Sequence, residues 1–352
     1  MKKRKAIIFT ASLAAGAVCF LLTADSKAAV DVARKSVETC LSVIIPSLFA
    51  FMVFSRIVIK SGIADTALFP LYKLSSFWFR GSRRDFSIFI LSLIGGYPVG
   101  ISLLKEEIAY NKNYTAIAEK MLCFCYCGSP SFIIQIAGLS VLGSTKAGLI
   151  IYFSNVLACF TTAIFFNIFG MPKISAYEAN VPSPKITLKD FTDSISSTVK
   201  SLAVICGTIL AFNIILELIN YVGAMELLRA FGLDKAAAAA FEISNLSLFK
   251  GRDGAILPLL SGLTSFGGLC IIMQTAALSD NKIPLKKFIL FRIPAALLSS
   301  MYSYLLLCLF PVAVEAYLPS NTVTVLSSVN PVCSLCITAM TYILLKSKRD
   351  AS

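Results

Sequence analysis

The 352-residue sequence contains no histidine, and only 14% of its residues are charged. Without histidine, the Ser-His-Asp and Cys-His arrangements that activate nucleophiles are excluded, and so is a Cys/His zinc site. No other nucleophile–base pair, metal cluster or phosphate-binding loop stands out, so we expect neither an enzyme nor a bound cofactor or metal. Soluble domains carry about 25% charged residues, so the low charge also argues against a soluble protein.

Apolar residues dominate the composition instead. Hydrophobic residues make up 57% of the chain, and the mean hydropathy is +0.80. Apolar runs alternate with short basic connections, and each run is about as long as the ~20 residues that a helix needs to cross a bilayer. These runs are too long and too uniform for barrel strands. The sequence therefore predicts an all-α polytopic membrane protein that contacts the lipid bilayer.

The net charge of +13 invites comparison with nucleic-acid-binding proteins. The basic residues, however, gather at the ends of the apolar runs, which is the topology signal of inner-membrane proteins. We therefore expect a multi-pass protein of the bacterial plasma membrane, with no nucleic-acid partner.

The apolar runs predict eight transmembrane helices and two shorter segments that enter and leave the membrane on the same side. The re-entrant segments are 87–104 and 233–250. The spans are 6–24, 37–59, 121–137, 147–169, 201–222, 256–278, 288–310 and 324–345. The first run follows a basic N-terminus and also matches a signal peptide, so its cleavage stays open.

The distribution of Lys and Arg supports this topology. With both short segments re-entrant, 22 of the 32 Lys and Arg residues lie on the side of the two termini and 8 on the other. If 87–104 crossed fully, every later connection would change sides and the bias would collapse. The positive-inside rule therefore favours the re-entrant topology, with both termini in the cytoplasm.

The predicted elements occur in the same order twice. A span, a re-entrant segment and two further spans make up a first unit, and the same order follows in the opposite orientation in a second. We assign residues 1–36 to an anchor helix and outer connection, 37–170 to the first unit, 171–200 to a cytoplasmic linker, 201–310 to the second unit and 311–352 to a last helix and basic tail. Inverted repeats with broken helices near the midplane are typical of secondary transporters.

Helix breakers and polar side chains inside the apolar runs are the candidate solute contacts. Backbone that breaks inside a membrane must line a cavity or be buried in protein, although small residues also serve plain helix packing. The predicted substrate-binding residues are Gly95, Gly96, Tyr97, Pro98, Gly100, Ser129 and Pro130 in the first unit and Glu242, Asn245, Gly267, Gly268 and Gln274 in the second.

Arg56, Glu217 and Arg292 are further ionisable residues within the predicted spans. Such groups are costly at membrane depth and are functional candidates by default. We expect Arg56 and Glu217 to extend from span ends to the interface. For Arg292, a structural ion pair and a substrate contact are both open.

Four motifs carry a family resemblance. They are Ile-Pro-Ser-Leu-Phe at 45–49, Ser-Leu-Ile-Gly-Gly-Tyr-Pro-Val-Gly at 92–100, Cys-Gly-Ser-Pro-Ser-Phe at 127–132 and Ser-Phe-Gly-Gly-Leu-Cys-Ile-Ile-Met-Gln at 265–274. Together they resemble the YlbJ-like sporulation integral membrane proteins, which belong with the nucleoside-recognition, or gate, domain proteins. The family has a Glu-Gly-Thr/Ser-like run where this chain has Phe241-Glu242-Ile243-Ser244-Asn245, so the acid is retained and the glycine is not.

The resemblance implies a plasma-membrane protein of spore cortex formation. Because the gate domain is shared with concentrative nucleoside transporters and ferrous-iron permeases, it also implies movement of a solute. We therefore expect a transporter or permease of an unidentified small solute or ion, with a midplane site between the two units. The alternative is a non-transporting scaffold that assembles a spore-envelope complex, either as a homo-oligomer or with other sporulation membrane proteins.

The topology predicts where the connection from Lys105 to Lys120 lies. Cysteines introduced along it should react with a membrane-impermeant thiol reagent only when the cytoplasmic face is exposed. Labelling of intact cells from outside would contradict the re-entrant topology.

Overall fold

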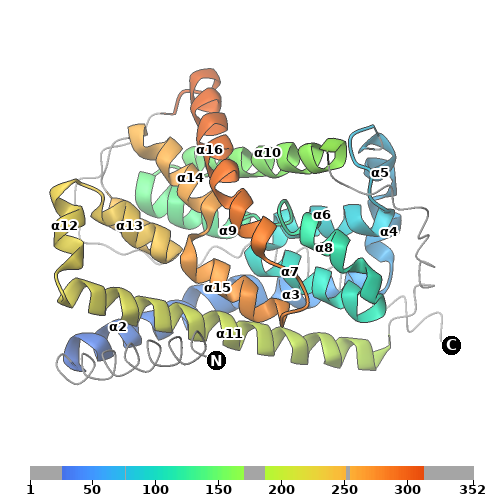
Figure 1. Cartoon of the computed structure of the whole chain (residues 1–352), viewed down its shortest axis with the longest axis horizontal. Helices are drawn as coiled ribbons and strands as arrows, with labels where there is room; N and C mark the ends of the chain where they lie inside the picture. Colours follow the sequence, from blue (N-terminus) through green and yellow to red (C-terminus); the bar gives the residue numbers. More distant parts are fainter. Residues whose placement is uncertain (1–25, 76, 170–186, 251–253, 313–352) are drawn as a thin grey trace, which may run out of the picture.

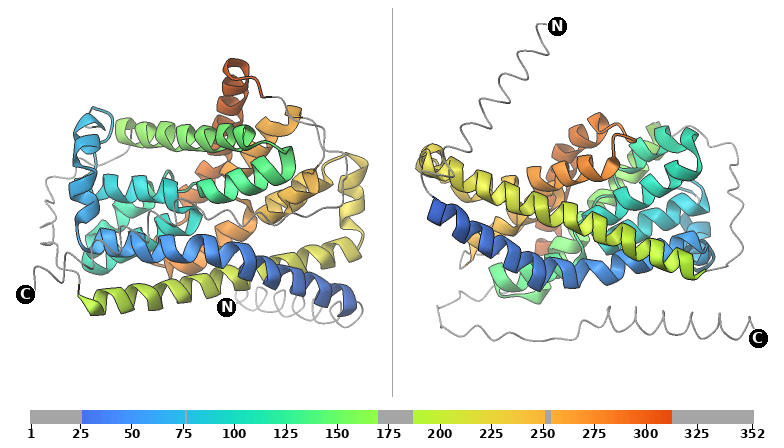
Figure 2. Two further views of the ribbon diagram at one scale, coloured as in Figure 1. Left: turned by 180° about the vertical axis from the view of Figure 1, so that it is seen from behind. Right: turned by 90° about the horizontal axis from the view of Figure 1, so that it is seen from below.

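The computed structural model describes residues 26–75, 77–169, 187–250 and 254–312, and every regular element in these ranges is a helix. The helices α3, α10 and α11 run along the longest axis of the molecule, with α10 on one side and α3 and α11 on the other, and α16 stands across this axis (Figure 1). Shorter, broken helices fill the space between them, as the two views of Figure 2 also show. This layout places the helix breaks in the interior of the protein.

Five helices in the described ranges are long and apolar enough to cross a bilayer. They are Lys27–Lys60, Thr145–Ile168, Leu188–Tyr221, Leu257–Ser279 and Lys286–Leu309. The chain is therefore an all-helical, multi-pass membrane protein by the composition of its helices. The predicted spans 6–24 and 324–345, both termini and most of the predicted C-terminal unit lie outside the described residues.

The first half opens with one long helix and ends with another. In order it contains α2 (Ser26–Thr39), the π-helical turn η1 (Cys40–Ile44), α3 (Ile45–Lys60), α4 (Ile63–Ala67), α5 (Phe69–Ser75), α6 (Arg83–Gly95), α7 (Tyr97–Tyr110), η2 (Lys112–Tyr114), α8 (Thr115–Met121), α9 (Pro130–Phe132), η3 (Ile133–Val141) and α10 (Thr145–Phe169). The predicted span 121–137 is interrupted, because residues 122–129 are not helical.

The second half also opens with one long helix and ends with another. It contains α11 (Leu188–Tyr221), α12 (Ala224–Ala230), α13 (Asp234–Phe241), η4 (Ile243–Phe249), η5 (Gly254–Ile256), α14 (Leu257–Phe266), α15 (Gly268–Ser279) and α16 (Lys286–Leu309). The last of these carries Pro294 in its interior.

Two helices extend beyond their predicted bounds. The predicted outer connection before residue 37 is helical from Ser26, because no glycine or proline interrupts the chain before Pro46. Likewise α11 begins at Leu188, inside the predicted linker 171–200, where Thr187 and Asp190 form a capping box. The boundaries at 36/37 and 200/201 were therefore placed inside continuous helices.

Helices α6 and α7 form a hairpin around Gly96. The turn needs a glycine because φ is +93° there. Arg84 at the start of α6 pairs with Glu107 at the end of α7, with 2.7 Å between Nη2 and Oε1. A continuous helix would separate these residues by about 35 Å, so both ends of the hairpin lie at the same end of the molecule.

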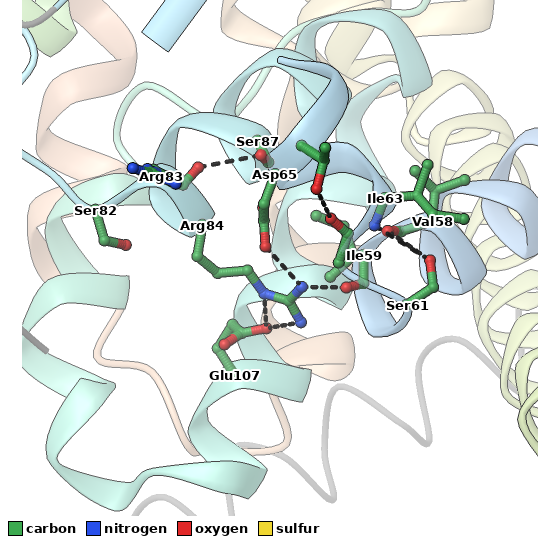
Figure 3. A network of polar contacts seen from close by, with 12 residues as sticks. Val58, Ile59, Ser61, Ile63, Asp65, Ser82, Arg83, Arg84, Ser87 and Glu107 are labelled. Atoms are coloured by element: carbon green, nitrogen blue, oxygen red, sulfur yellow. Dashed lines mark hydrogen bonds and ion pairs between the residues drawn. The ribbon is translucent and has the colours of Figure 1, made fainter. Parts of the chain in front are cut away.

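Arg84 also ties the hairpin to the end of α3. It donates to the carbonyl oxygen of Ile59 and lies 3.4 Å from a carboxylate oxygen of Asp65 in α4 (Figure 3). Nearby, Tyr114 donates to Asp85, which caps α6 together with Ser82. Four separate segments therefore meet around one guanidinium.

Other polar contacts gather at this same end, which we call the basic end. Lys287 at the start of α16 lies 2.8 Å from Glu119 of α8. Arg56 of α3 pairs with Glu106 of α7 and donates to Ser201 of α11 at 3.1 Å. The connections predicted to be cytoplasmic at 60–84, 105–120 and 282–287 and the start of α11 thus lie together.

The Arg84 contacts predict a stability difference between two adjacent arginines. Arg84→Met leaves two partly buried carboxylates unpaired and should destabilise the protein by about 3–5 kcal/mol. The exposed neighbour Arg83, which only covers the ring of Phe69, provides the control, and Arg83→Met should cost less than about 1 kcal/mol. Unfolding in detergent by denaturant titration measures both; equal effects would contradict the role given to Arg84.

Candidate functional site

A small cavity of about 60 Å³ lies where the two halves meet. A cavity holds one water from about 10–15 Å³ upward, so this space accommodates several waters or a small solute. Its lining residues are Thr39, Ile44, Ser47, Leu48, Gly96, Tyr97, Pro98, Ser129 and Phe132 from the first half and Ile205, Ile209, Glu242, Ile243, Ser244, Ile271 and Gln274 from the second.

Two helix breaks of the first half meet at the cavity. Gly96, in the α6–α7 turn, approaches so closely that a Cβ atom there would lie 3.1 Å from the Cβ of Ser129. Ser129 precedes α9, and its hydroxyl accepts from the backbone N–H of Phe132. The serine therefore caps one helix while it abuts the break between two others.

Tyrosines join these breaks to the break in the second half. The hydroxyl of Tyr97 donates to the backbone carbonyl of Thr264, near the end of α14. The ring of Tyr97 lies 4.9 Å from that of Tyr126, whose hydroxyl fills the space in front of Gly267. Gly267 has φ of +84° and separates α14 from α15.

The fourth break, between α13 and η4, contains Glu242. This side chain is only 2% exposed, and it accepts from the backbone N–H of Ser244 at 2.9 Å and from the Ser244 hydroxyl. No ion pair in the described part of the chain involves Glu242. Gly268 lies against this break, since a Cβ there would meet Ala240 O and Ile243 N at 3.3 and 3.5 Å.

Arg292 supports the non-helical stretch 122–129. Its side chain is 1% exposed, donates to the carbonyl oxygen of Cys123 and stacks over the ring of Tyr126 at 4.3 Å. No carboxylate of the described ranges pairs with it, so the ion-pair interpretation is not met there. Its contacts show that the guanidinium holds backbone freed by a helix break.

Arg56 differs from its prediction. We expected it to extend to the interface, but only 6% of the residue is exposed and it pairs with Glu106. Its position more than one turn before the end of α3 directs the side chain onto α7 and α11. Arg56 therefore pairs with a carboxylate inside the protein and does not extend to the membrane interface.

A buried polar network behind the cavity escaped the sequence prediction. Asn155 of α10 donates to Thr264 Oγ1 at 2.9 Å and accepts from Ser299 of α16, which lies 2.8 Å from Ser261 of α14. Asn155 is a strongly polar residue in the middle of a predominantly apolar run, and that asparagine was the available signal. The network fixes α10, α14 and α16 relative to one another.

The predicted site residues fall into two groups. Six of them line the cavity together: Gly96, Tyr97, Pro98, Ser129, Glu242 and Gln274. The other six surround it without lining it: Gly95, Gly100, Pro130, Asn245, Gly267 and Gly268.

Several of these residues act differently from the way the sequence suggested. Gly95 and Gly100 lie within α6 and α7 and allow close packing against Phe51 and the Cys125 carbonyl. Pro98 lies in the first turn of α7, where a missing N–H is tolerated, so it starts a helix instead of stopping one. Asn245 donates to Ala238 O of its own segment at 3.4 Å.

Comparisons with known proteins give no match: neither the protein-family models, nor the curated proteins, nor the solved structures contain one. The resemblance to the YlbJ-like family therefore stays a prediction.

The left-handed turn at Gly267 predicts a sharp contrast between two glycines. Gly267→Ala forces a non-glycine residue to positive φ, at a cost of about 1–2 kcal/mol, and pushes Tyr126 aside. Gly207→Ala, in α11 with nothing within 4 Å of the new methyl group, should instead stabilise by up to about 1 kcal/mol. Thermal unfolding in detergent compares them; a neutral Gly267→Ala would contradict the packing described.

Proposed function

We propose that this chain is a membrane transport protein that moves a small polar solute or ion through the cavity between two inverted units. One observation carries the proposal: the cavity is lined by helix breaks from both halves. Gly96, Pro98 and Ser129 come from the first half, and Glu242 and Gln274 from the second. Broken helices that meet near the membrane midplane form the usual solute sites of secondary transporters.

The order of helices supports an inverted repeat. The helices Lys27–Lys60 and Leu188–Tyr221 each have 34 residues. Each ends at a left-handed glycine, Gly62 with φ of +70° and Gly223 with φ of +79°, and a short helix follows. Further along the first half come the pair α6–α7, the interrupted segment from α8 to η3 and the long helix α10. Further along the second half come the pair α13–η4, the pair α14–α15 and the long helix α16.

The α6–α7 hairpin supports the re-entrant part of the proposed topology. Its two ends share the Arg84–Glu107 pair at the basic end, while its turn at Gly96 reaches the cavity. We propose that the basic end faces the cytoplasm, that 87–104 and 233–250 are re-entrant, and that eight helices cross the membrane. From the resemblance of the four motifs, we also propose that the protein lies in the plasma membrane and takes part in spore cortex formation.

The chemistry of the cavity narrows the class of solute. Its lining residues include one acid, Glu242, one amide, Gln274, the hydroxyl residues Thr39, Ser47, Ser129 and Ser244, and several isoleucines, and most of the lining surface is apolar. Such a lining suits a small cation, or a neutral molecule with several O–H or N–H donors and an apolar surface. A multiply charged anion would face the Glu242 carboxylate and be repelled.

Reconstituted protein tests this proposal directly. Liposomes containing the protein should take up at least one of three labelled probes, Rb⁺, putrescine or uridine, faster than protein-free liposomes. Glu242→Gln removes the only carboxylate of the cavity and Gly96→Leu fills its wall, so each should lower uptake at least tenfold.

Glu226→Gln provides the matched control, because Glu226 is exposed on α12 and should leave uptake unchanged. If uptake is absent, or if Glu242→Gln and Gly96→Leu leave it intact, the cavity is not a transport site. Spore formation that survives both cavity substitutions but fails on substitution of exposed apolar residues, such as Phe153 or Leu297, would favour the scaffold.

A further inference from the structure

A second polar region lies on the cavity side of the basic end. Four buried side-chain atoms there have no hydrogen-bond partner among the described protein groups: Arg56 Nε, Ser102 Oγ, Glu106 Oε2 and Thr198 Oγ1. Ser102 is 5% exposed and Thr198 is fully buried. In native proteins roughly 90% or more of buried polar groups are satisfied, so four orphans in one region call for a ligand.

Two of these atoms belong to one ion pair, Arg56–Glu106, and the other two lie on the helices that contact it. Arg56 binds Glu106 through Nη1 and donates to Ser201 through Nη2 at 3.1 Å. Ser102 lies one turn from Glu106 on the same face of α7, and Thr198 lies one turn from Ser201 on the same face of α11. The unpartnered groups therefore come from three helices that converge on the guanidinium of Arg56.

The same three helices line the cavity further along. Leu48, Pro98 and Ile205 are cavity residues. Arg56 lies eight residues after Leu48, and Glu106 lies eight residues after Pro98, which corresponds to about 12 Å along a helix. Ser201 precedes Ile205 by one turn. Because α3 and α7 run toward the basic end and α11 begins there, Ser102 lies on the cavity side of the ion pair and Thr198 on the basic-end side.

The chemistry of the four atoms identifies their ligand. Arg56 Nε is a donor, Glu106 Oε2 an acceptor, and the two hydroxyls serve as either. The charges of Arg56 and Glu106 offset each other, so no free ion is required for neutrality. Water, which both donates and accepts, can satisfy all four groups.

We propose that Arg56, Ser102, Glu106, Thr198 and Ser201 line a water-filled inner vestibule that connects the cavity to the basic end. The Arg56–Glu106 pair spans this vestibule and is the barrier that separates its two parts. The inference rests on the proposed transport function, since it names the inner half of the solute path, but the water itself is detectable without any transport assay.

Thiol accessibility tests the vestibule. Single variants Ser102→Cys and Thr198→Cys, in lipid nanodiscs, are treated with the small hydrophilic reagent 2-aminoethyl methanethiosulfonate, and each modified peptide is quantified by mass spectrometry. Ser92→Cys is the matched control, because Ser92 is fully buried in the same hairpin but donates to Phe89 O at 2.6 Å. Thr198→Cys should react at least tenfold faster than Ser92→Cys.

The barrier predicts a second difference. Glu106→Gln weakens the ion pair with Arg56. When it is combined with Ser102→Cys, the introduced thiol should react at least fivefold faster than in the Ser102→Cys single variant. When it is combined with Ser92→Cys, the reaction rate should not change. The vestibule is refuted if both test cysteines react no faster than the control. It is equally refuted if Thr198→Cys alone reacts and Glu106→Gln changes nothing at Ser102.

The unaltered protein offers an independent readout, which holds even if a variant fails to fold. Hydroxyl-radical footprinting oxidises buried side chains beside bound water. Met52, one turn from Arg56 on α3 and 1% exposed, should be oxidised several-fold faster than the fully buried Met121. Equal rates would contradict a water-filled path. If the vestibule residues are labelled but no solute is taken up, only the transport proposal is refuted. If solute uptake depends on Glu242 but the vestibule residues are not labelled, only the vestibule is refuted.

Discussion

A helix that breaks inside an apolar interior releases backbone N–H and C=O groups, and each of these needs a new partner. In this protein several of the partners come from segments far away in the sequence. The carbonyl of Thr264 before the Gly267 break is bound by Tyr97, which follows the Gly96 break. The carbonyl of Cys123 is bound by Arg292, whose guanidinium is covered by Tyr126. These contacts tie the break at Gly267 to the break at Gly96, and α16 to the stretch 122–129.

The cavity follows from this assembly. Positive-φ glycines at positions 96, 267 and 268 turn the chain sharply, and the capping side chains Ser129 and Glu242 point their oxygens at nearby backbone N–H groups. These polar groups are held among isoleucines of α11 and α15. At the basic end, Arg84 and Arg56 tie α3, α7 and α11 together around buried carboxylates. We propose that a solute passes between these two regions.

The sequence allowed the breaks to be predicted because glycine and proline are local signals. The turn at Gly96 and the breaks near Gly128–Ser129 and Gly267–Gly268 occur where those residues stand. Six predicted contacts consequently line one cavity. The distribution of basic residues likewise predicted which connections lie on the same side, and these connections meet at the basic end. These features depend on short segments or on composition.

Contacts that depend on how the helices pack against one another were harder to predict from the sequence. That Arg56 meets Glu106 depends on how α3 faces α7, fifty residues later, and an apolar run containing one arginine does not reveal that facing. Asn155 and Ser299 meet through two different helices for the same reason. Helix ends were also misplaced at residues 37 and 200, since the polar turns before them contain good helix formers and no breaker.

The central claim is that two inverted halves enclose a polar site inside the bilayer. The most direct measurement is a cryo-electron-microscopy structure of the protein in a lipid nanodisc. The account predicts Gly96, Ser129, Glu242 and Gln274 around one cavity at half the depth of the lipid density, with the Arg84–Glu107 pair at one membrane face. A structure with these four residues apart, or with the α6–α7 hairpin outside the bilayer, would contradict it.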